Sequence, residues 1–167
     1  MTKTCIVVTG FMGTGKSTIG PVLAGTLGWR WLDTDTMITL KAGMSIPQIF
    51  ATHGEAHFRQ MERELCQSLT QETECVVSTG GGMLVDDENR RLLIESSFVV
   101  CLTAPEDMLA RRLDGPSHSR PLATSWRDLL ASRQPAYDQI PYQIDTAGKS
   151  PQRIAQEIIT LWRSESA

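Results

Sequence analysis

Residues 10–20 read GFMGTGKSTIG, and this stretch contains the complete pattern G-x-x-x-x-G-K-[ST]. The apolar, β-rich run TCIVVT comes directly before it, at residues 4–9. Between a strand and a helix, such a loop turns successive N–H groups inward around phosphate oxygens, and the helix directs its positive end at the same place. The pattern therefore predicts a strand, a phosphate-binding loop and a helix, with a nucleoside triphosphate as ligand, ATP being the simplest choice.

Two side chains of this loop have predicted roles in triphosphate binding. Lys16 would place its charge beside the β- and γ-phosphates, and the Ser17 hydroxyl would face a magnesium ion. Pro21 falls early in the following helix, where an N–H would otherwise bond back to about Ser17, so we expect a local distortion there.

Alternating strands and helices indicate an α/β fold with right-handed crossovers. Apolar runs at residues 4–9, 74–79 and 98–103 are typical of parallel strands that are covered on both faces, and shorter candidates lie at 30–32 and 142–144. Ser45 and Thr103 each stand three residues before a Gln or Glu, which is capping-box spacing. Ser150 followed by proline predicts a further helix start.

The composition fits one soluble domain that spans residues 1–167. The net charge of −3 creates no basic field for nucleic acid, so any anion needs a local site. No run approaches the roughly 18 apolar residues of a membrane span, and the N-terminal run is too short for a signal peptide. We expect a cytoplasmic monomer whose four scattered cysteines are buried and reduced, namely Cys5, Cys66, Cys75 and Cys101.

The sequence LDTD, at residues 32–35, follows one of the short predicted strands. If the strand continues, Asp33 and Asp35 face the same side. One carboxylate could then hold a magnesium-bound water, and the other could accept a hydrogen bond from a substrate hydroxyl and help to deprotonate it. A solvated acid pair or a helix N-cap is the alternative.

Further clusters follow along the chain. Arg59 and Glu62 are three residues apart on a predicted helix, which is also the spacing of a surface ion pair. Glycines 80–82 follow a predicted strand directly, so a ligand could press on their backbone, although a flexible turn is the other interpretation. His53 and His57 are four residues apart, but the glutamate between them does not fit known helical zinc motifs, so we expect no metal there.

The segment LDGPSHSRPLATS, at residues 113–125, has no apolar period. A loop of this length in a small domain is either a tolerated surface loop or a mobile functional lid, and Arg120 at its centre favours the lid.

In their order and spacing, GFMGTGKSTIG, DTD, FRQME, STGGG, RPL and RQPAY closely resemble the shikimate kinase family, from Gly10 to about Pro151. The resemblance implies a P-loop three-layer α/β/α sandwich whose five-stranded parallel sheet has the order 2-3-1-4-5. It also implies a helical substrate-binding segment at residues 33–62 and a mobile lid at 112–124. Departures are Pro21, where the family commonly has arginine, and the lid sequence PLATS.

The same resemblance implies transfer of the ATP γ-phosphate to the 3-hydroxyl of shikimate, with Mg2+ as cofactor. Asp35 resembles the acid that contacts the accepting hydroxyl, and Arg120 resembles the lid arginine beside the transferring phosphate. The implied nucleotide-binding residues are Gly13, Thr14, Gly15, Lys16, Ser17, Thr18, Arg112, Arg120 and Lys149. The implied shikimate-binding residues are Asp35, Arg59, Gly80, Gly81, Gly82 and Arg133, and the implied magnesium-site residues are Ser17 and Asp33.

Two alternatives remain on the sequence alone. One is a kinase of the same fold for another small hydroxy acid such as gluconate, and the other is a non-catalytic ATP-binding module. The paired arginines with the glycine triplet argue against the first, and the presence of Asp35 with every arginine argues against the second.

Overall fold

The computed structural model describes residues 3–114 and 126–165 of this chain. Within them, five parallel strands form one sheet in the order β2-β3-β1-β4-β5, which confirms the expected topology. The strands are β1 (Cys5–Gly10), β2 (Arg30–Asp33), β3 (Cys75–Ser78), β4 (Phe98–Thr103) and β5 (Tyr142–Asp145). Each overlaps a strand predicted from an apolar run.

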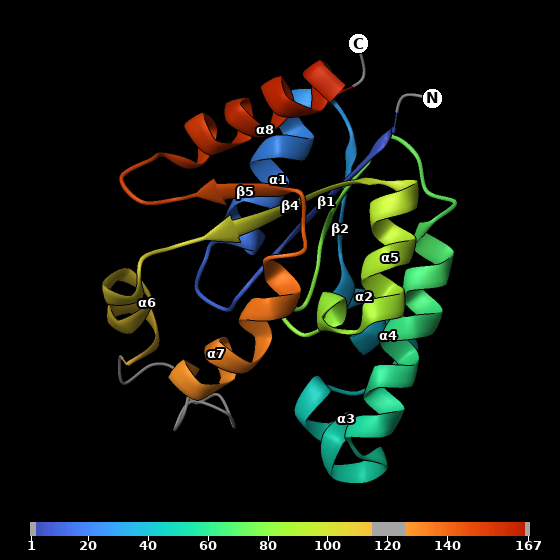
Figure 1. Ribbon diagram of the computed structural model, residues 1–167. Coiled ribbons are helices and arrows are strands. Elements are labelled where there is room, and N and C mark those ends of the chain that lie inside the picture. Colours follow the sequence, from blue (N-terminus) through green and yellow to red (C-terminus); the bar gives the residue numbers. More distant parts are fainter. Residues whose placement is uncertain (1–2, 115–125, 166–167) are drawn as a thin grey trace.

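Helices cover both faces of the sheet, as Figure 1 shows. On one face lie α1 (Lys16–Leu27) and α8 (Pro151–Glu165). On the other lie α4 (Glu55–Leu69), the short 3-10 helix η1 (Met83–Val85), α5 (Asp87–Ser96) and α7 (Trp126–Tyr137). Two helices, α2 (Thr34–Ala42) and α3 (Ile46–His53), pack against α4 beyond the end of the sheet, and α6 (Glu106–Leu113) follows β4.

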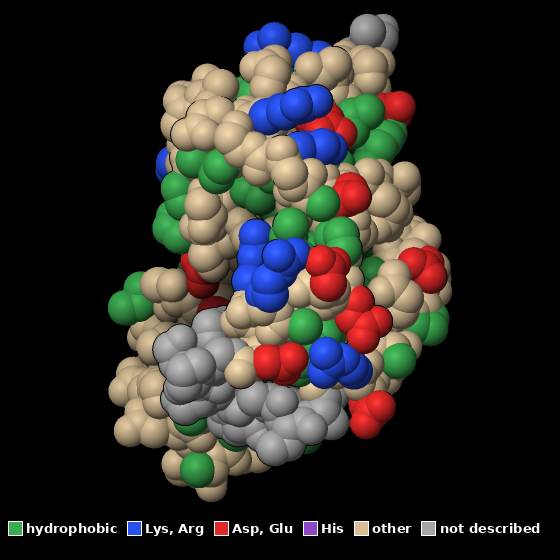
Figure 2. Space-filling model, turned by 90° about the vertical axis from the view of Figure 1, so that its left-hand side faces the viewer, with side chains coloured by type: hydrophobic (Ala, Val, Ile, Leu, Met, Phe, Trp, Pro, Cys, Tyr) green, Lys and Arg blue, Asp and Glu red, His purple; other side chains and the backbone are tan. Residues whose placement is uncertain are grey.

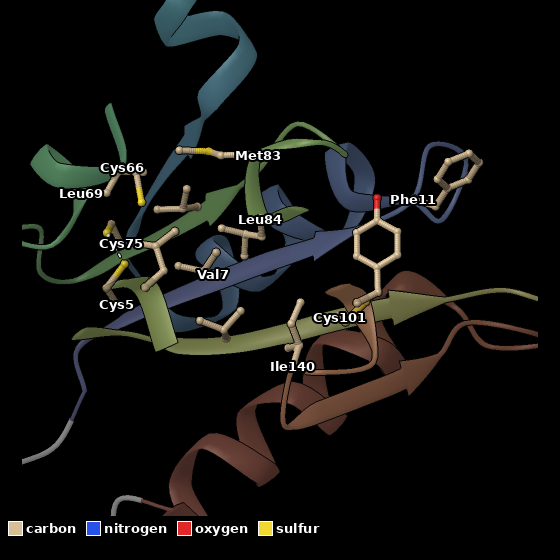
Figure 3. Packing of buried hydrophobic residues seen from close by; sticks show 14 of the residues in the cluster. Cys5, Val7, Phe11, Cys66, Leu69, Cys75, Met83, Leu84, Cys101 and Ile140 are labelled. Atoms are coloured by element: carbon tan, nitrogen blue, oxygen red, sulfur yellow. Dashed lines mark hydrogen bonds between the residues drawn. The ribbon is translucent and has the colours of Figure 1, made fainter. Parts of the chain in front are cut away.

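Alternate residues of each strand supply two apolar cores. Ile6 and Val8 of β1 point toward α1 and α8, where they meet Leu23 and Ile158. Val7 points to the opposite face, and Figure 3 shows it among buried residues from α4, η1 and the strands. All four cysteines are buried and none forms a disulfide, as expected, although the sulfurs of Cys5 and Cys75 lie 3.2 Å apart on neighbouring strands.

The predicted helix starts have different outcomes. Ser45 forms the expected capping box with Gln48, and Ser150 Oγ accepts a hydrogen bond from the Arg153 N–H at 3.2 Å. The prediction that Thr103 caps a helix was wrong, because α6 begins at Glu106 and its N-cap is Pro105. Thr103 still belongs to β4, and helical geometry is disfavoured at Ala104, the residue that directly precedes Pro105.

Because all strands are parallel, their carboxyl ends meet at one edge of the sheet, where ligands commonly bind in such folds. The loop after β1, the DTD residues after β2 and the glycine triplet after β3 all leave the sheet at this edge. Elsewhere α1 continues through Pro21, which is exposed, as far as Leu27. In the described parts of the chain, no helix is both long enough and apolar enough to cross a membrane.

Candidate active site

The loop between β1 and α1 has the backbone of a phosphate cradle. Gly13 has φ of 80° and Gly15 has φ of 102°, a conformation that side chains rarely tolerate. Gly15 is the N-cap of α1, makes no side-chain capping bond, and no acidic residue lies in the first turn. The positive end of the helix is therefore directed at the loop without a carboxylate to neutralise it. Lys16 Nζ donates to the carbonyls of Gly10 at 2.7 Å and Phe11 at 2.8 Å, which holds the amine over the same loop.

The first turn of α1 is braced by the neighbouring strands. Ser78 Oγ donates to the Lys16 carbonyl at 3.0 Å and accepts from the Trp31 indole N–H at 3.0 Å. A Cβ placed at Gly20 would overlap both the Ser78 hydroxyl and the Trp31 ring. The close approach of α1 to the sheet therefore needs a glycine at this position.

Asp33 is the last residue of β2, but the strand does not continue to Asp35, so the two aspartates do not share one side of a strand; for Asp33 the alternative of a helix N-cap is correct. The chain turns into α2 at Thr34, and Asp33 is the N-cap, with Oδ1 accepting from the Thr36 N–H at 2.9 Å. Asp35 lies in the first turn of the helix. Both carboxylates nevertheless line one cavity with the phosphate loop.

This cavity has a volume of about 1360 Å³ and runs along the carboxyl edge of the sheet, from α8 past the phosphate loop to α3. Among its described lining residues, cations outnumber carboxylates. The cations are Lys16, Arg59, Arg111, Arg112, Arg133 and Lys149, and the carboxylates are Asp33, Asp35 and Glu62. Figure 2 shows basic side chains gathered at the centre of the face where β4 and β5 end. A chain with a net charge of −3 thus has a local site for anions.

Three side chains converge on the glycine triplet from three different helices. A Cβ at Gly80 would lie 2.6 Å from Asp35 Oδ1, and one at Gly82 would lie 2.7 Å from Arg59 Nη1. A Cβ at Gly81 would lie 3.1 Å from Arg133 Nη1. Glycine is therefore needed at 80 and 82 so that a carboxylate of α2 and a guanidinium of α4 can approach the backbone.

The ion pair on α4 is not a surface pair. Arg59 Nη1 donates to Glu62 at 2.7 Å, and the Glu62 side chain is only 3% exposed. Burial raises the pKa of Glu62 and the Asp35 carboxylate adds to the increase, while the guanidinium groups of Arg59 and Arg133 oppose it. The pair fixes the direction in which Arg59 points, because the carboxylate that holds it cannot move into solvent.

At the other end of the cavity, Arg112 donates to the Gly13 carbonyl, and Lys149 forms an ion pair with Glu157 at 2.8 Å. Both side chains line the cavity near the phosphate loop. Of the expected lid, Arg112 and Leu113 end α6 and Asp114 is the C-cap of that helix. The rest of it, with Arg120, lies outside the described residues.

Sequence reasoning missed the apolar wall of the cavity. It comes from α3 and α4 and consists of Ile46, Pro47, Phe50, Ala51 and Phe58. Phe50 and Phe58 lie 4.9 Å apart between ring centroids, yet Phe50 remains 37% exposed. The apolar face of the short α3 helix could have indicated this wall. The two histidines end up on separate helices, because Gly54 ends α3 before α4 begins, and no group of three potential metal-binding side chains occurs in the described parts.

Known proteins with this sequence pattern and fold identify the family. The sequence model described as shikimate kinase matches residues 12–163. The shikimate kinase of Geobacter metallireducens is 44% identical over 159 residues, which cover 92% of this chain and 88% of that protein. The structure of the Acinetobacter baumannii shikimate kinase in complex with shikimate is 35% identical, with a TM-score of 0.87, and the match covers 98% of this chain and 95% of that one.

A gluconokinase from Sinorhizobium meliloti has a TM-score of 0.65 at 18% identity, over 99% of this chain and 94% of that one, which is a likeness of fold only. The family match, in contrast, begins at Met12 inside the phosphate loop and extends over the aspartates, the glycine triplet and both arginines. This chain belongs to the shikimate kinase family.

Proposed function

We propose that this chain transfers the γ-phosphate of ATP to the 3-hydroxyl of shikimate, giving 3-phosphoshikimate and ADP. One observation carries the proposal: Asp35, Arg59 and Arg133 meet at the glycine triplet, in the same cavity as the phosphate loop. The site thus combines a triphosphate cradle with a carboxylate and two guanidinium groups beside it. A small anionic polyol fits such a pocket, because a guanidinium group binds a carboxylate through two parallel N–H···O hydrogen bonds.

The proposed roles follow from these positions. Arg59 and Arg133 hold the carboxylate of shikimate, while Asp35 accepts a hydrogen bond from the reacting hydroxyl and so orients or deprotonates it. Lys16 and the N-terminal N–H groups of α1 hold the phosphates, so that the γ-phosphoryl group lies in line with that hydroxyl. Arg112 and Lys149 are assigned to the nucleotide side, and the role of Arg120 beside the transferring phosphate stays a prediction from the resemblance.

Ser17 and Asp33 would hold Mg2+, and their chemistry fits that ion. Both line the cavity next to the phosphate loop, and both offer the hard oxygen donors that Mg2+ prefers. The described residues contain no cluster of three His, Cys, Asp or Glu side chains that could hold a metal by themselves. Mg2+ in nucleotide sites usually takes most of its ligands from water and the substrate phosphates. When bound, the ion would neutralise charge on the phosphates during transfer.

The apolar wall of α3 and α4 supports shikimate over a linear hydroxy acid such as gluconate. The side chain of Phe50, which is 37% exposed, offers apolar contact area to a carbocyclic ring, whereas an open-chain polyol would need hydrogen-bonding partners there. The complete set of Asp35, Arg59 and Arg133 likewise argues against a non-catalytic ATP-binding module. We further propose that the protein acts as a cytoplasmic monomer that binds no nucleic acid.

The decisive experiment is a coupled ADP-release assay with MgATP and either shikimate or gluconate as acceptor. We expect turnover with shikimate and only background with gluconate or without an acceptor. Turnover with gluconate alone would favour the other kinase, and nucleotide binding without turnover on either acceptor would favour the binding module.

A further inference from the structure

Tyr137 is the last residue of α7 and of the sequence RQPAY, and its role is not explained by the site described above. It is 2% exposed, and its hydroxyl donates to the Gly81 carbonyl at 2.5 Å, across 56 residues of sequence. Its ring belongs to the apolar core beneath the site, and its own carbonyl accepts from the Gln143 side chain at 2.8 Å. The hydroxyl is therefore presented to the triplet from a fixed position.

The three carbonyls of the glycine triplet are held in two ways. Those of Gly80 and Gly82 accept from the backbone N–H groups of Met83 and Val85, at 3.2 Å each, within the local turn and η1. That of Gly81 accepts from the side chain of Tyr137. Consecutive glycines lose much conformational entropy on ordering. The Gly80 N–H donates to the Thr34 hydroxyl at 2.9 Å, so the first residue of the triplet already has a long-range hydrogen bond, and the bond from Tyr137 supplies a second one at the middle residue.

Gly81 also lies between the acceptor side of the site, represented by Arg133, and the phosphate loop, represented by Gly10. A Cβ there would lie 3.1 Å from Arg133 Nη1 and 3.6 Å from the Gly10 carbonyl, the same carbonyl that accepts from Lys16. Arg133 and Tyr137 lie one turn apart on α7, which contacts η1 directly (Figure 1). One helix thus supplies both an arginine to the cavity and the anchor of the backbone beside that arginine.

We propose that Tyr137 is a positioning residue, which fixes the glycine triplet at Gly81 so that the triplet and Arg133 present a preformed site to the acceptor. The inference rests on the proposed function, because it assigns the triplet to acceptor binding rather than nucleotide binding. Burial raises the pKa of Tyr137 to about 12, partly offset by the Arg133 guanidinium, so the phenol remains a hydrogen-bond donor at working pH.

The test is Tyr137→Phe, which keeps the ring and removes the hydroxyl. We expect KM for shikimate to rise about fivefold, the effect of losing one hydrogen bond, while KM for MgATP changes by less than about twofold. The matched control is Tyr142→Phe, the other tyrosine of this chain. It stacks on Phe98 at 4.6 Å between centroids and lines a separate small cavity, so both constants should stay at wild-type values.

A second measurement needs no activity. Hydrogen exchange of the free protein should become faster at amides 80–83 in Tyr137→Phe and stay unchanged at the phosphate loop, with neither change in Tyr142→Phe. If the wild type does not phosphorylate shikimate, the proposed function fails, yet the exchange result still decides whether Tyr137 fixes the triplet. Equal shifts of both KM values, or unchanged exchange at 80–83, would overturn the positioning role.

Discussion

At the scale of single residues, the site depends on where a few charged groups meet the backbone. Asp35 approaches Gly80 more closely than a side chain at that position would allow, and Arg59 approaches Gly82 in the same way. The shape of the site therefore depends on the positions of these side chains as well as on their charges. Substitutions that keep the shape of these side chains separate the two contributions.

Asp35→Asn keeps the size of the side chain and removes its charge. We expect turnover to fall to background, because an amide cannot accept a proton from the hydroxyl, while ATP affinity stays within about twofold. Steady-state assays and nucleotide calorimetry measure the two effects, with the exposed Asp138→Asn as the control. Normal turnover of Asp35→Asn would remove Asp35 from the mechanism.

Arg133→Ala removes one of the two guanidinium groups that we assign to the acceptor carboxylate. Shikimate affinity should fall by about 10- to 100-fold, the range for charge-assisted hydrogen bonds, with ATP affinity changed much less. Calorimetric titration with each ligand measures this, and Arg91→Ala, which breaks an exposed pair with Glu95 on α5, serves as the control. Equal losses for both ligands would mean that Arg133 has been misassigned.

At the scale of elements, α4 carries two glutamates whose environments have opposite effects. Glu62 is buried under Arg59, and burial raises its pKa. Glu64 lies two residues further on, is exposed, and hydrogen bonds from Lys41 and Gln60 lower its pKa. Glu64 can therefore serve as the control for Glu62 when the pH dependence of stability is measured.

The two pKa shifts predict opposite pH dependences of stability. A carboxyl with a raised pKa binds its proton more tightly in the native state, so its stabilisation is present below its unfolded pKa and is lost as pH rises through the folded value. Wild type should therefore lose stability relative to Glu62→Gln as pH rises from about 4, the ordinary pKa of a glutamate, through the raised pKa of Glu62. Relative to Glu64→Gln, wild type should gain stability as pH rises through the range in which Glu64 loses its proton. This gain should be small, because the pair is exposed, and it should shrink further at high salt.

Urea unfolding at a series of pH values measures both differences. Slopes of the same sign for Glu62→Gln and Glu64→Gln would contradict the assignment of a buried, destabilised carboxylate to position 62.

The strands and the phosphate loop could be predicted because their signals are local: continuous apolar runs and glycines at fixed offsets. The start of α2 could not. Thr34 is buried, and its hydroxyl accepts from the Gly80 N–H at 2.9 Å, a contact across 46 residues that no short pattern contains. The same applies to Glu62, whose spacing from Arg59 is equally that of a solvated pair, and to Gly20, whose neighbours come from β2 and β3.

At the scale of the whole molecule, the sheet shields four thiols from solvent. Burial raises the pKa values of Cys66 and Cys101 to about 12, and all four cysteines are buried. Because the thiolate is the reactive form, a reagent can reach any of the four thiols only when the native packing opens, and at Cys66 and Cys101 the raised pKa also disfavours the thiolate until it does.

We therefore expect a thiol reagent at about pH 8 to label none of the cysteines in the native protein and all of them in urea. On long incubation, any labelling that occurs through rare opening of the native protein should be slower with shikimate and ADP present, since ligands that bind the folded state stabilise it. Mass spectrometry of labelled protein counts the modified sites. Fast labelling of any cysteine without unfolding would show that the packing around that thiol is looser than described here.

The glycine triplet has a consequence for attempts to retarget this enzyme by directed evolution. A charged side chain lies against each of its positions, so nearly every replacement there would displace a group that we assign to acceptor recognition. The α3 part of the apolar wall, Ile46, Pro47, Phe50 and Ala51, is less restricted, because these side chains are exposed or partly exposed, whereas Phe58 on α4 is buried in a hydrophobic cluster. Libraries that vary the α3 residues and leave the triplet intact would explore new acceptor shapes while the phosphate-transfer apparatus remains whole.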